Sequence, residues 1–285
     1  MKIHIVNYEQ GRFDGILSKY ARMMKDVLIK RGHKVTLGST PSPKAEVNHH
    51  INYLPYDHKK SSKSINTLMV THITTPAKWE AIKKGMDTAD CGICFSEDTQ
   101  KLLEGKGLKR LHTILPAHDS LQRRPRIVSI LTNVYPDGCK REGMFLKLLE
   151  YIDRKKFVFF IMGKDWERIL EPWLGTDFQG QLHREFEPND YKRILDISDY
   201  CLYFGDDEGS MGILDAAQCG VKTIAPNTGF HQDIGIDYPF ETQEELNQIF
   251  DKLGTNPVED WTWDNYCRDH EKIWGDLLKE KSTKK

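Results

Sequence analysis

Short apolar segments alternate along the chain with longer segments whose apolar residues recur every three or four positions. Residues 2–6 (KIHIV) form one apolar run, and residues 16–30 carry Ile16, Tyr20 and Met24 at helical spacing. Such runs predict a strand and an amphipathic helix respectively. Strands that alternate with helices are typical of βαβ units, in which helices cover both faces of a parallel sheet. The pattern therefore predicts an α/β protein.

The alternation continues to the end of the chain, with one interruption. Further strands are predicted at residues 33–38, 46–54, 65–73, 91–96, 111–116, 126–132, 156–163, 181–185, 199–205 and 221–226. The interruption, residues 117–126 (AHDSLQRRPR), is polar, basic and contains proline, as linkers between domains do. We expect one Rossmann-like domain over 1–122, a second over 123–262, and a C-terminal amphipathic helix over 263–285. On one face this helix should carry Trp263, Tyr266, Trp274 and Leu277 or Leu278.

The composition is that of an ordinary globular protein, with 39% hydrophobic residues. No apolar run approaches the roughly 20 residues of a membrane span, and the N-terminal segment turns polar too early for a signal peptide. We therefore expect a cytoplasmic protein with reduced cysteines. Cys91 and Cys94 form a C-x-x-C pair, but a strand would point them to opposite faces. No group of His, Cys and Asp has the spacing of a metal site, so we expect no metal.

The formal net charge of −1 conceals an asymmetry. Residues 1–122 carry 19 Lys and Arg against 12 Asp and Glu, whereas the remainder carries 22 against 30. Basic residues gather on the predicted first helix and a nearby loop: Lys19, Arg22, Lys25, Lys30, Arg31, Lys59, Lys60 and Lys63. This pattern indicates either solvated helix faces or a surface that attracts anions. On the second interpretation we expect salt-sensitive association with anionic vesicles, and DNA is the lesser alternative.

The segment DDEGSMGILDAAQCGVKTIAPNTG, residues 206–229, follows a predicted strand. Parallel sheets bind ligands at the carboxyl ends of their strands, so this segment should line a ligand site. A helix that begins near Gly209 or Ser210 would present free N–H groups and a partial positive charge, and Gly209 and Gly212 permit close approach. The segment therefore predicts a phosphate site.

Two carboxylates flank this predicted helix start. Asp207 lies just before it, and Asp215 follows about two turns later. A carboxylate accepts hydrogen bonds from two hydroxyl groups at once, which suits sugars and riboses. A phosphate site between two hydroxyl-binding acids predicts a nucleotide sugar as the ligand.

The ordered motifs resemble those of the retaining glycosyltransferases of family 4, which have the GT-B fold. The matching segments are ADCGICFSEDTQKLLEGKGL, LHTILPAHD, RIVSILTNVYPDGCKREGMFLKLLEYI, EFEPNDYKRILDISDYCLYFG and DEGSMGILDAAQCGVKTIAPNTGF, and together they span nearly the whole chain. The resemblance implies two Rossmann-like domains that face each other across a cleft, with the C-terminal helix returning to the first domain. It also implies glycosyl transfer from a nucleoside diphosphate sugar to an acceptor hydroxyl, with retention of the anomeric configuration.

Carried onto this sequence, the resemblance assigns Asp215 to the ribose hydroxyls and Asp207 to the transferred sugar. Both are Asp where the family has Glu, and Glu208 is an alternative to Asp207. The distal phosphate is assigned to the backbone of Gly209, Ser210 and Met211.

Other residues match the loops that approach the diphosphate in the family. Lys140 and Arg141 match a basic residue that neutralises the leaving group, while Asn133 stands where the family usually has Arg. His72 resembles a histidine near the sugar. In the family, glycines in the loop after the first strand let that loop approach the diphosphate and the acceptor. Gly11 or Gly15 resembles these glycines.

In the implied mechanism Lys140, Arg141 and the helix start stabilise the leaving diphosphate, so no metal or other cofactor is expected. The leaving phosphate itself takes the acceptor's proton, and no general base is assigned. The acceptor is expected to be an anionic or membrane-associated glycan or lipid, met at the inner membrane surface. Three alternatives stay open: a GT-B-like sugar-nucleotide epimerase, a non-catalytic partner subunit that binds the nucleotide sugar, and a glycosyltransferase that acts on modified DNA.

Overall fold

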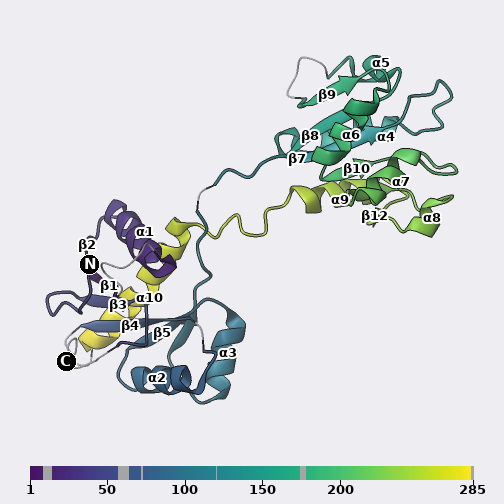
Figure 1. Ribbon diagram of the computed structural model, residues 1–285. Coiled ribbons are helices and arrows are strands. Elements are labelled where there is room, and N and C mark those ends of the chain that lie inside the picture. The colour runs from purple at the N-terminus through teal and green to yellow at the C-terminus, as the bar shows by residue number, and fades with distance from the viewer. Residues whose placement is uncertain (9–14, 57–63, 72, 120, 174–177, 284–285) are drawn as a thin grey trace. The chain divides into compact units, whose positions relative to one another are not determined.

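The computed structural model describes residues 1–8, 15–56, 64–71, 73–119, 121–173 and 178–283. The chain divides into two compact units, one of residues 1–121 with 257–285 and one of residues 122–256. Each unit contains a parallel sheet with helices interleaved between its strands, so the two Rossmann-like α/β domains predicted from the sequence are present (Figure 1). The second unit ends at Asn256, and residues 257–262 therefore belong with the first unit.

In the described residues of the first unit, six strands form a sheet in the order β2-β1-β3-β4-β5-β6, and every neighbouring pair is parallel. The strands are β1 (Lys2–Val6), β2 (Lys34–Gly38), β3 (Val47–His50), β4 (Ile65–Val70), β5 (Cys91–Cys94) and β6 (Leu111–Thr113). The helices are α1 (Ile16–Lys30), α2 (Pro76–Met86), α3 (Glu97–Gly105) and α10 (Trp263–Thr283).

The two faces of this sheet have separate cores. Residues of α1 and α10 pack on one face, and residues of α2 and α3 pack on the other. Cys91 belongs to the first core and Cys94 to the second, which confirms the prediction that their side chains point to opposite faces. Burial raises the pKa of each thiol to about 12, so both are protonated at neutral pH.

Helix α10, yellow in Figure 1, lies beside α1 in the first unit. The sequence predicted an apolar face on this helix, and Trp263, Tyr266 and Trp274 are indeed buried in the core that α1 shares. The indole N–H of Trp274 donates to Thr67 Oγ1 of β4 over 3.2 Å, so its one polar atom is satisfied. Three buried aromatic side chains therefore fix α10 to the sheet. None of the described helices is both long enough and apolar enough to cross a membrane.

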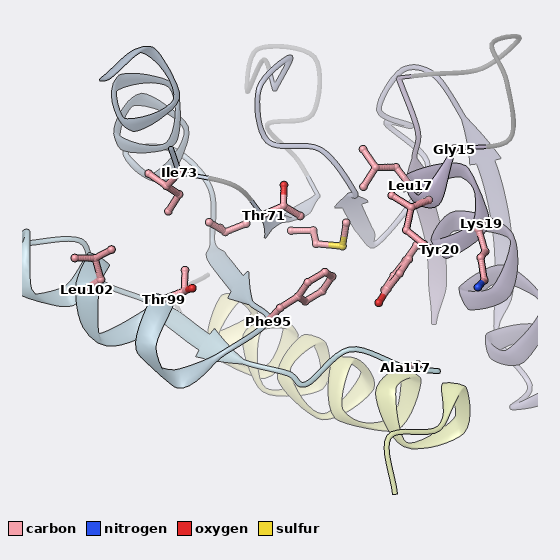
Figure 2. A pocket seen from close by; sticks show the side chains of 13 residues that line it. Gly15, Leu17, Lys19, Tyr20, Thr71, Ile73, Phe95, Thr99, Leu102 and Ala117 are labelled. Carbon is pink, nitrogen blue, oxygen red and sulfur yellow. The ribbon is translucent and has the colours of Figure 1, made fainter. Parts of the chain in front are cut away.

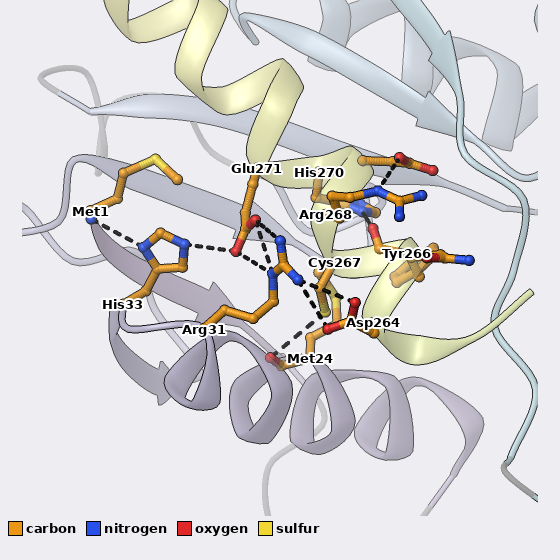
Figure 3. A network of polar contacts seen from close by, with 12 residues as sticks. Met1, Met24, Arg31, His33, Asp264, Tyr266, Cys267, Arg268, His270 and Glu271 are labelled. Atoms are coloured by element: carbon orange, nitrogen blue, oxygen red, sulfur yellow. Dashed lines mark hydrogen bonds and ion pairs between the residues drawn. The ribbon is translucent and has the colours of Figure 1, made fainter.

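A polar network joins α10 to the end of α1 (Figure 3). Arg31 donates from Nε and Nη2 to Glu271 over 2.9 and 2.8 Å, and from Nη1 to Asp264 over 3.0 Å. His33 Nε2 lies 2.7 Å from the same Glu271 carboxylate. Burial acts to raise the pKa of Glu271, but the hydrogen bonds from Arg31 and His33 outweigh burial and hold the pKa below its usual value.

This network also reduces the basic surface predicted on α1. Arg31 is neutralised by two carboxylates of α10, and Lys19 forms an ion pair with Asp119 at 2.6 Å. At least two of the five basic residues predicted for the helix surface, Lys19 and Arg31, are therefore bound within the unit. The three loop lysines of that surface, Lys59, Lys60 and Lys63, lie outside the described residues.

In the described residues of the second unit, a six-stranded parallel sheet has the order β12-β11-β10-β7-β8-β9. The strands are β7 (Arg126–Leu131), β8 (Phe157–Met162), β9 (Gly180–His183), β10 (Tyr200–Leu202), β11 (Lys222–Ala225) and β12 (Tyr238–Pro239). The helices are α4 (Gly143–Tyr151), η2 (Arg154–Lys156), α5 (Trp166–Leu170), α6 (Pro188–Ile197), α7 (Met211–Gln218), α8 (His231–Ile234) and α9 (Gln243–Gly254). Residues of α4 and α9 pack on one face of the sheet, and residues of α6 and α7 pack on the other.

Several predicted strands end earlier than the sequence suggested. The prediction over 46–54 shortens to β3, although Ile51 and Tyr53 stay fully buried beyond its end. The prediction over 65–73 shortens to β4. The Ile51 N–H still donates to the carbonyl of Val6 over 3.2 Å, and apolar burial continues to Tyr53 where the chain leaves the sheet. The two-residue strand β12 was not predicted, since it is too short to show alternation.

We expect Glu271→Gln to lower the free energy of unfolding of the first unit by about 1 to 3 kcal/mol, because Arg31 loses a charged acceptor. Urea denaturation, with hydrogen exchange of α10 as the local readout, measures this. The lowered pKa of Glu271 means that its contribution is present above 4.5 and is lost as the pH falls below that value, so the difference between variant and wild type should shrink there.

Asp276→Asn is the matched control, since Asp276 lies on the same helix, is 59% exposed and pairs with the exposed Lys279 one turn away. It should change stability by less than about 0.5 kcal/mol. Equal losses in the two variants would show that the network does not hold α10.

Candidate functional site

A cavity of about 500 Å³ lies in the second unit, at the carboxyl ends of β7 and β8 and the start of α7. The strand order reverses between β7 and β10, because the chain first adds β8 and β9 on one side of β7 and then β10, β11 and β12 on the other. Loops diverge at such a reversal and leave a crevice, which is where open parallel sheets bind ligands. The cavity therefore occupies the position that the topology favours for a ligand site.

The lining of this cavity is basic although the unit as a whole is acidic. Residues 122–256 carry 16 Lys and Arg against 23 Asp and Glu. Among the described lining residues, however, none is acidic and three are basic: Lys140, Lys164 and Arg184. Arg184 is paired with Glu167, while Lys164 is exposed. A positive lining within a negative unit indicates a site for an anion.

The loops after β7 and β8 are held together by close backbone contacts. Gly163 has a φ of +155°, and a Cβ there would collide with the carbonyl of Thr132. The Lys164 N–H donates to Asn133 Oδ1 over 2.9 Å, and the Trp166 indole donates to Thr132 O over 2.7 Å. Asn133 lines the cavity, and its side chain also fixes the loop that carries Lys164.

The loop before α7 is fixed by a buried histidine. His231 Nε2 accepts the N–H of Ser210 over 2.9 Å, and its Nδ1 donates to the carbonyl of Pro226 over 2.9 Å. These two bonds define the tautomer, since only the neutral ring with hydrogen on Nδ1 can make both. A backbone hydrogen bond joins the same two loops, since the Phe230 N–H donates to the carbonyl of Glu208 over 3.1 Å. The start of α7 is thus positioned from the neighbouring loop.

The free donors at the start of α7 are the N–H groups of Met211 and Gly212. Gly209 and Ser210 also line the cavity, but their own N–H groups donate to Asp207 and His231. In the part of the chain that the structure describes, no backbone or side-chain acceptor receives the N–H of Met211 or Gly212. Both face the cavity as lining residues, and together they form an anion seat at the positive end of the helix.

Lys140 lies in a compact triad with Tyr203 and Asp207. Its Nζ donates to Asp207 Oδ2 over 2.5 Å and to the Tyr203 hydroxyl over 2.7 Å, and that hydroxyl donates to Asp207 Oδ1 over 2.7 Å. Burial acts to lower the pKa of Lys140, but its two hydrogen bonds outweigh burial and raise the pKa above its usual value. Burial likewise acts to raise the pKa of Asp207, and the bonds from Lys140 and Tyr203 reverse the shift. The triad therefore holds a charged ammonium at the cavity wall.

Asp207 and Asp215, the two acids predicted to bind hydroxyl groups, do not line the cavity themselves but are hydrogen-bonded to side chains that do. Lys140 and Tyr203 line the cavity, whereas Asp207 does not. Tyr191 lines it as well, and its hydroxyl donates over 2.6 Å to Asp215, which also does not line it. Burial and the bond to Asp215 raise the pKa of Tyr191, so this hydroxyl stays protonated. Each carboxylate thus reaches the cavity through a tyrosine.

Two further predicted residues of this unit lie outside the cavity lining. Arg141 has a φ of +48°, and its Nε donates to the carbonyl of Phe204 over 2.6 Å. Its Nη1 donates to the carbonyl of Glu241 over 3.4 Å, so the guanidinium connects the Lys140 loop to two other segments. Glu208 has an exposed side chain. The structure therefore separates Lys140, which lines the cavity, from its neighbour Arg141.

The remaining predicted residues belong to the first unit. Gly15 precedes α1 as its N-cap and lines a different cavity there. Gly11 and His72 lie outside the described residues. Among the described residues, no three His, Cys, Asp or Glu side chains gather in a way that could hold a metal ion.

Sequence reasoning missed five residues of the site. Arg184 follows directly on β9, and Lys164 is the second residue after β8, so the rule that ligands bind at the carboxyl ends of parallel strands would have found them. Tyr203 follows β10 in the same way. Tyr191 and His231 act through contacts with residues far away in the sequence, and no local pattern indicates them.

The chain matches no family model, and no curated protein matches its sequence. Solved structures that resemble it include HepE of Anabaena in complex with UDP and glucose, with 11% sequence identity, 100% of this chain and 99% of that chain covered, and a TM-score of 0.36. AviGT4, a glycosyltransferase involved in avilamycin A biosynthesis, has 12% identity, 98% coverage of each chain and a TM-score of 0.37. The catalytic domain of starch synthase IV from Arabidopsis thaliana, bound to ADP and acarbose, has 12% identity, 95% and 80% coverage, and a TM-score of 0.38. Similarity at this level carries no argument about function.

We expect His231→Phe to lower the free energy of unfolding of the second unit by about 2 to 4 kcal/mol, because a buried N–H and a buried carbonyl lose their partners. Hydrogen exchange at the Ser210 amide should accelerate by a larger factor than exchange in the strands. His231→Gln, whose amide can accept and donate, should recover part of the loss. If Ser210 kept its protection in the Phe variant, His231 would not be what positions the start of α7.

Proposed function

We propose that this protein is a glycosyltransferase that binds a nucleoside diphosphate sugar in the second unit and transfers the sugar to an acceptor hydroxyl. The observation that carries the proposal is the pairing, in one cavity, of the free N–H groups of Met211 and Gly212 with the Lys140 ammonium. A diphosphate carries charge on two adjacent phosphoryl groups, and this cavity offers a dipolar seat beside a point charge. A neutral ligand would leave the N–H groups of Met211 and Gly212 without a charged acceptor and would offer the Lys140 ammonium no negative partner besides Asp207.

The hydroxyl groups of such a donor would find acceptors close to the phosphate seat. Asp207 accepts hydrogen bonds from Lys140, Tyr203 and the Gly209 N–H, and only the Lys140 bond is to Oδ2. A diphosphate would compete with Asp207 for the Lys140 ammonium. Once Lys140 turns to the phosphate, Asp207 Oδ2 can accept from a hydroxyl of the transferred sugar. We assign Asp215, reached through Tyr191, to the ribose hydroxyls.

The step itself breaks the bond between the anomeric carbon and the diphosphate and forms a bond from that carbon to the acceptor oxygen. Negative charge grows on the leaving diphosphate, where Lys140 and the start of α7 would stabilise it. In the retaining route that the family resemblance implies, the leaving phosphate takes the acceptor's proton on the same face of the sugar. No protein carboxylate is assigned as nucleophile or base, and Arg141 braces the loop that positions Lys140.

The acceptor surface is proposed separately from the donor site. Salt-sensitive association of the first unit with an anionic membrane surface stays a prediction, with DNA as the lesser alternative. It is weakened by the internal pairing of Lys19 and Arg31. Lys25 and Lys30 also lie on α1.

We expect Met211→Pro to weaken binding of a nucleoside diphosphate by roughly 10- to 150-fold, the loss of one hydrogen bond to a charged group. Proline is tolerated at the first position of a helix, and it removes an N–H that makes no bond to any residue described by the structure. Ser210 already has φ −119° and ψ 127°, the conformation that a residue before proline requires. Isothermal titration calorimetry measures the affinity, and thermal unfolding confirms that the fold is intact.

Met211→Ala is the matched control. It keeps the N–H and removes only a side chain that is 63% exposed, so the affinity should stay within about threefold of wild type. Equal nucleoside diphosphate affinity in the Pro and Ala variants would show that the start of α7 does not bind the phosphate.

We also expect turnover of a nucleotide sugar to persist in excess chelator, because Lys140 and backbone donors supply the positive charge. NMR of the protein with a panel of nucleotide sugars, with and without EDTA, follows the products. Slow hydrolysis or transfer with retained configuration supports the proposal, and loss of turnover in EDTA with rescue by Mn²⁺ contradicts metal independence. Epimerisation would identify the isomerase alternative, and binding without turnover would identify a non-catalytic subunit.

A further inference from the structure

The first unit contains a cavity of its own, of about 820 Å³ (Figure 2). It lies at the carboxyl ends of β4 and β5 and is bounded by residues of α1 and α3. Its volume falls in the range of small-molecule sites in proteins. The proposed donor site does not use it.

The wall of this cavity is mainly apolar. Met69 and Val70 at the end of β4 are fully buried beneath it. Tyr20 and Phe95 form one wall, with ring centroids 5.5 Å apart, and the side chains of Leu17, Ile73 and Leu102 point into the same space (Figure 2). Such a wall gains free energy by excluding water and offers few partners to a hydrated sugar or a phosphate.

The rim is apolar as well. Ile16 at the start of α1 is 62% exposed, and Leu102 on α3 is 53% exposed. Both line the cavity, so apolar side chains stand in water on two different helices around one opening. Exposed apolar side chains that gather around a cavity are typical of a binding site for an apolar ligand.

The polar groups of the cavity carry no uncompensated charge. Lys19 is the single charged residue among the described lining residues, and Asp119 neutralises it at 2.6 Å. The Thr99 hydroxyl lies 3.0 Å from that of Ser96, and Thr71 adds a second hydroxyl. The cavity of the second unit differs from it: Lys140 and Arg184 in its lining are also paired with acids, but the exposed Lys164 and the unbonded N–H groups at the start of α7 lie there as well. The two cavities therefore differ in the ligand they suit: an anion in the second unit, and a neutral apolar group in the first.

We propose that the cavity of the first unit binds the apolar body of a small neutral alcohol, an amphiphile whose hydroxyl meets the few polar groups of the wall. Naming this alcohol as the sugar acceptor rests on the proposed function, whereas its binding does not. The same chemistry is offered by an alcohol dissolved in water and by one embedded in a membrane. A hydrophilic glycan fits less well, because the described residues of the wall offer few donors and acceptors for its hydroxyl groups.

The test uses the full chain and a neutral fluorescent probe, N-phenyl-1-naphthylamine, whose emission rises in an apolar site. We expect the probe to bind with one-to-one stoichiometry and to be displaced by decanol but not by glucose or maltose. Ile16→Glu and Leu102→Glu place a charge at the rim and should weaken probe binding by about tenfold or more, because the charge must be desolvated against the ligand. Neither variant should unfold the protein, since both side chains are largely exposed.

Ile29→Glu is the matched control. Ile29 lies on the same helix as Ile16, is 46% exposed and does not line the cavity, so probe affinity should stay at the wild-type value. Equal weakening in Ile16→Glu and Ile29→Glu, displacement by glucose, or no probe binding at all would overturn the proposal.

Two further arms separate this proposal from the proposed function and identify the source of the alcohol. Nucleoside diphosphate affinity should be unchanged in the rim variants and reduced in Met211→Pro, so either site can fail alone. Neutral phosphatidylcholine vesicles that contain dodecanol are compared with dissolved decanol. Co-sedimentation with the vesicles supports a membrane source, displacement by dissolved decanol alone supports a soluble one, and failure of both overturns the proposal.

Discussion

Parallel pairing of the strands is the constraint on which the rest of the structure depends. Every strand pair that the structure describes is parallel, so each strand must be followed by a crossover that returns the chain to the same edge. The crossovers supply the helices that bury both faces of each sheet. They also collect all loops after the strands at one edge, where the strand order reverses between β7 and β10. The cavity of the second unit follows from this topology before any side chain is considered.

Side chains then give the two cavities different chemistry on the same kind of scaffold. In the second unit, His231 accepts the Ser210 N–H. The N–H groups of the next two residues, at the start of α7, can therefore donate to a ligand. The Lys140 ammonium is bound to the Asp207 carboxylate. A ligand anion would have to compete with this carboxylate for it. In the first unit, Asp119 neutralises Lys19, and the rest of the described wall is mainly apolar. The mainly apolar lining of one cavity, and the basic side chains and unbonded helix N–H groups in the lining of the other, support a division between an anionic donor and a neutral apolar ligand.

The sequence predicted the elements more reliably than the contacts between them. Strands such as 2–6 and the apolar face of α10 were predicted correctly because their periodicity reflects burial directly. The prediction over 46–54 overran because apolar burial continues to Tyr53, beyond the end of β3.

For the site, local patterns identified the segment before α7 and Lys140. They could not show that Ser210 is engaged by His231, 21 residues away, or that Asp207 stands behind Lys140 rather than at the cavity surface. Such pairings depend on how loops from different strands meet. Gly11 and His72, predicted from the family resemblance, lie outside the described residues.

The central claim is that a diphosphate binds at the start of α7, and backbone amide NMR tests it most directly. The ¹⁵N–¹H resonances of Met211 and Gly212 are followed while ADP, UDP or GDP is added to the full chain. The account predicts large downfield proton shifts at these two amides, as each gains a charged acceptor, and a small shift at Ser210, whose N–H is already bound to His231. Saturable nucleotide binding that leaves Met211 and Gly212 unshifted would contradict it.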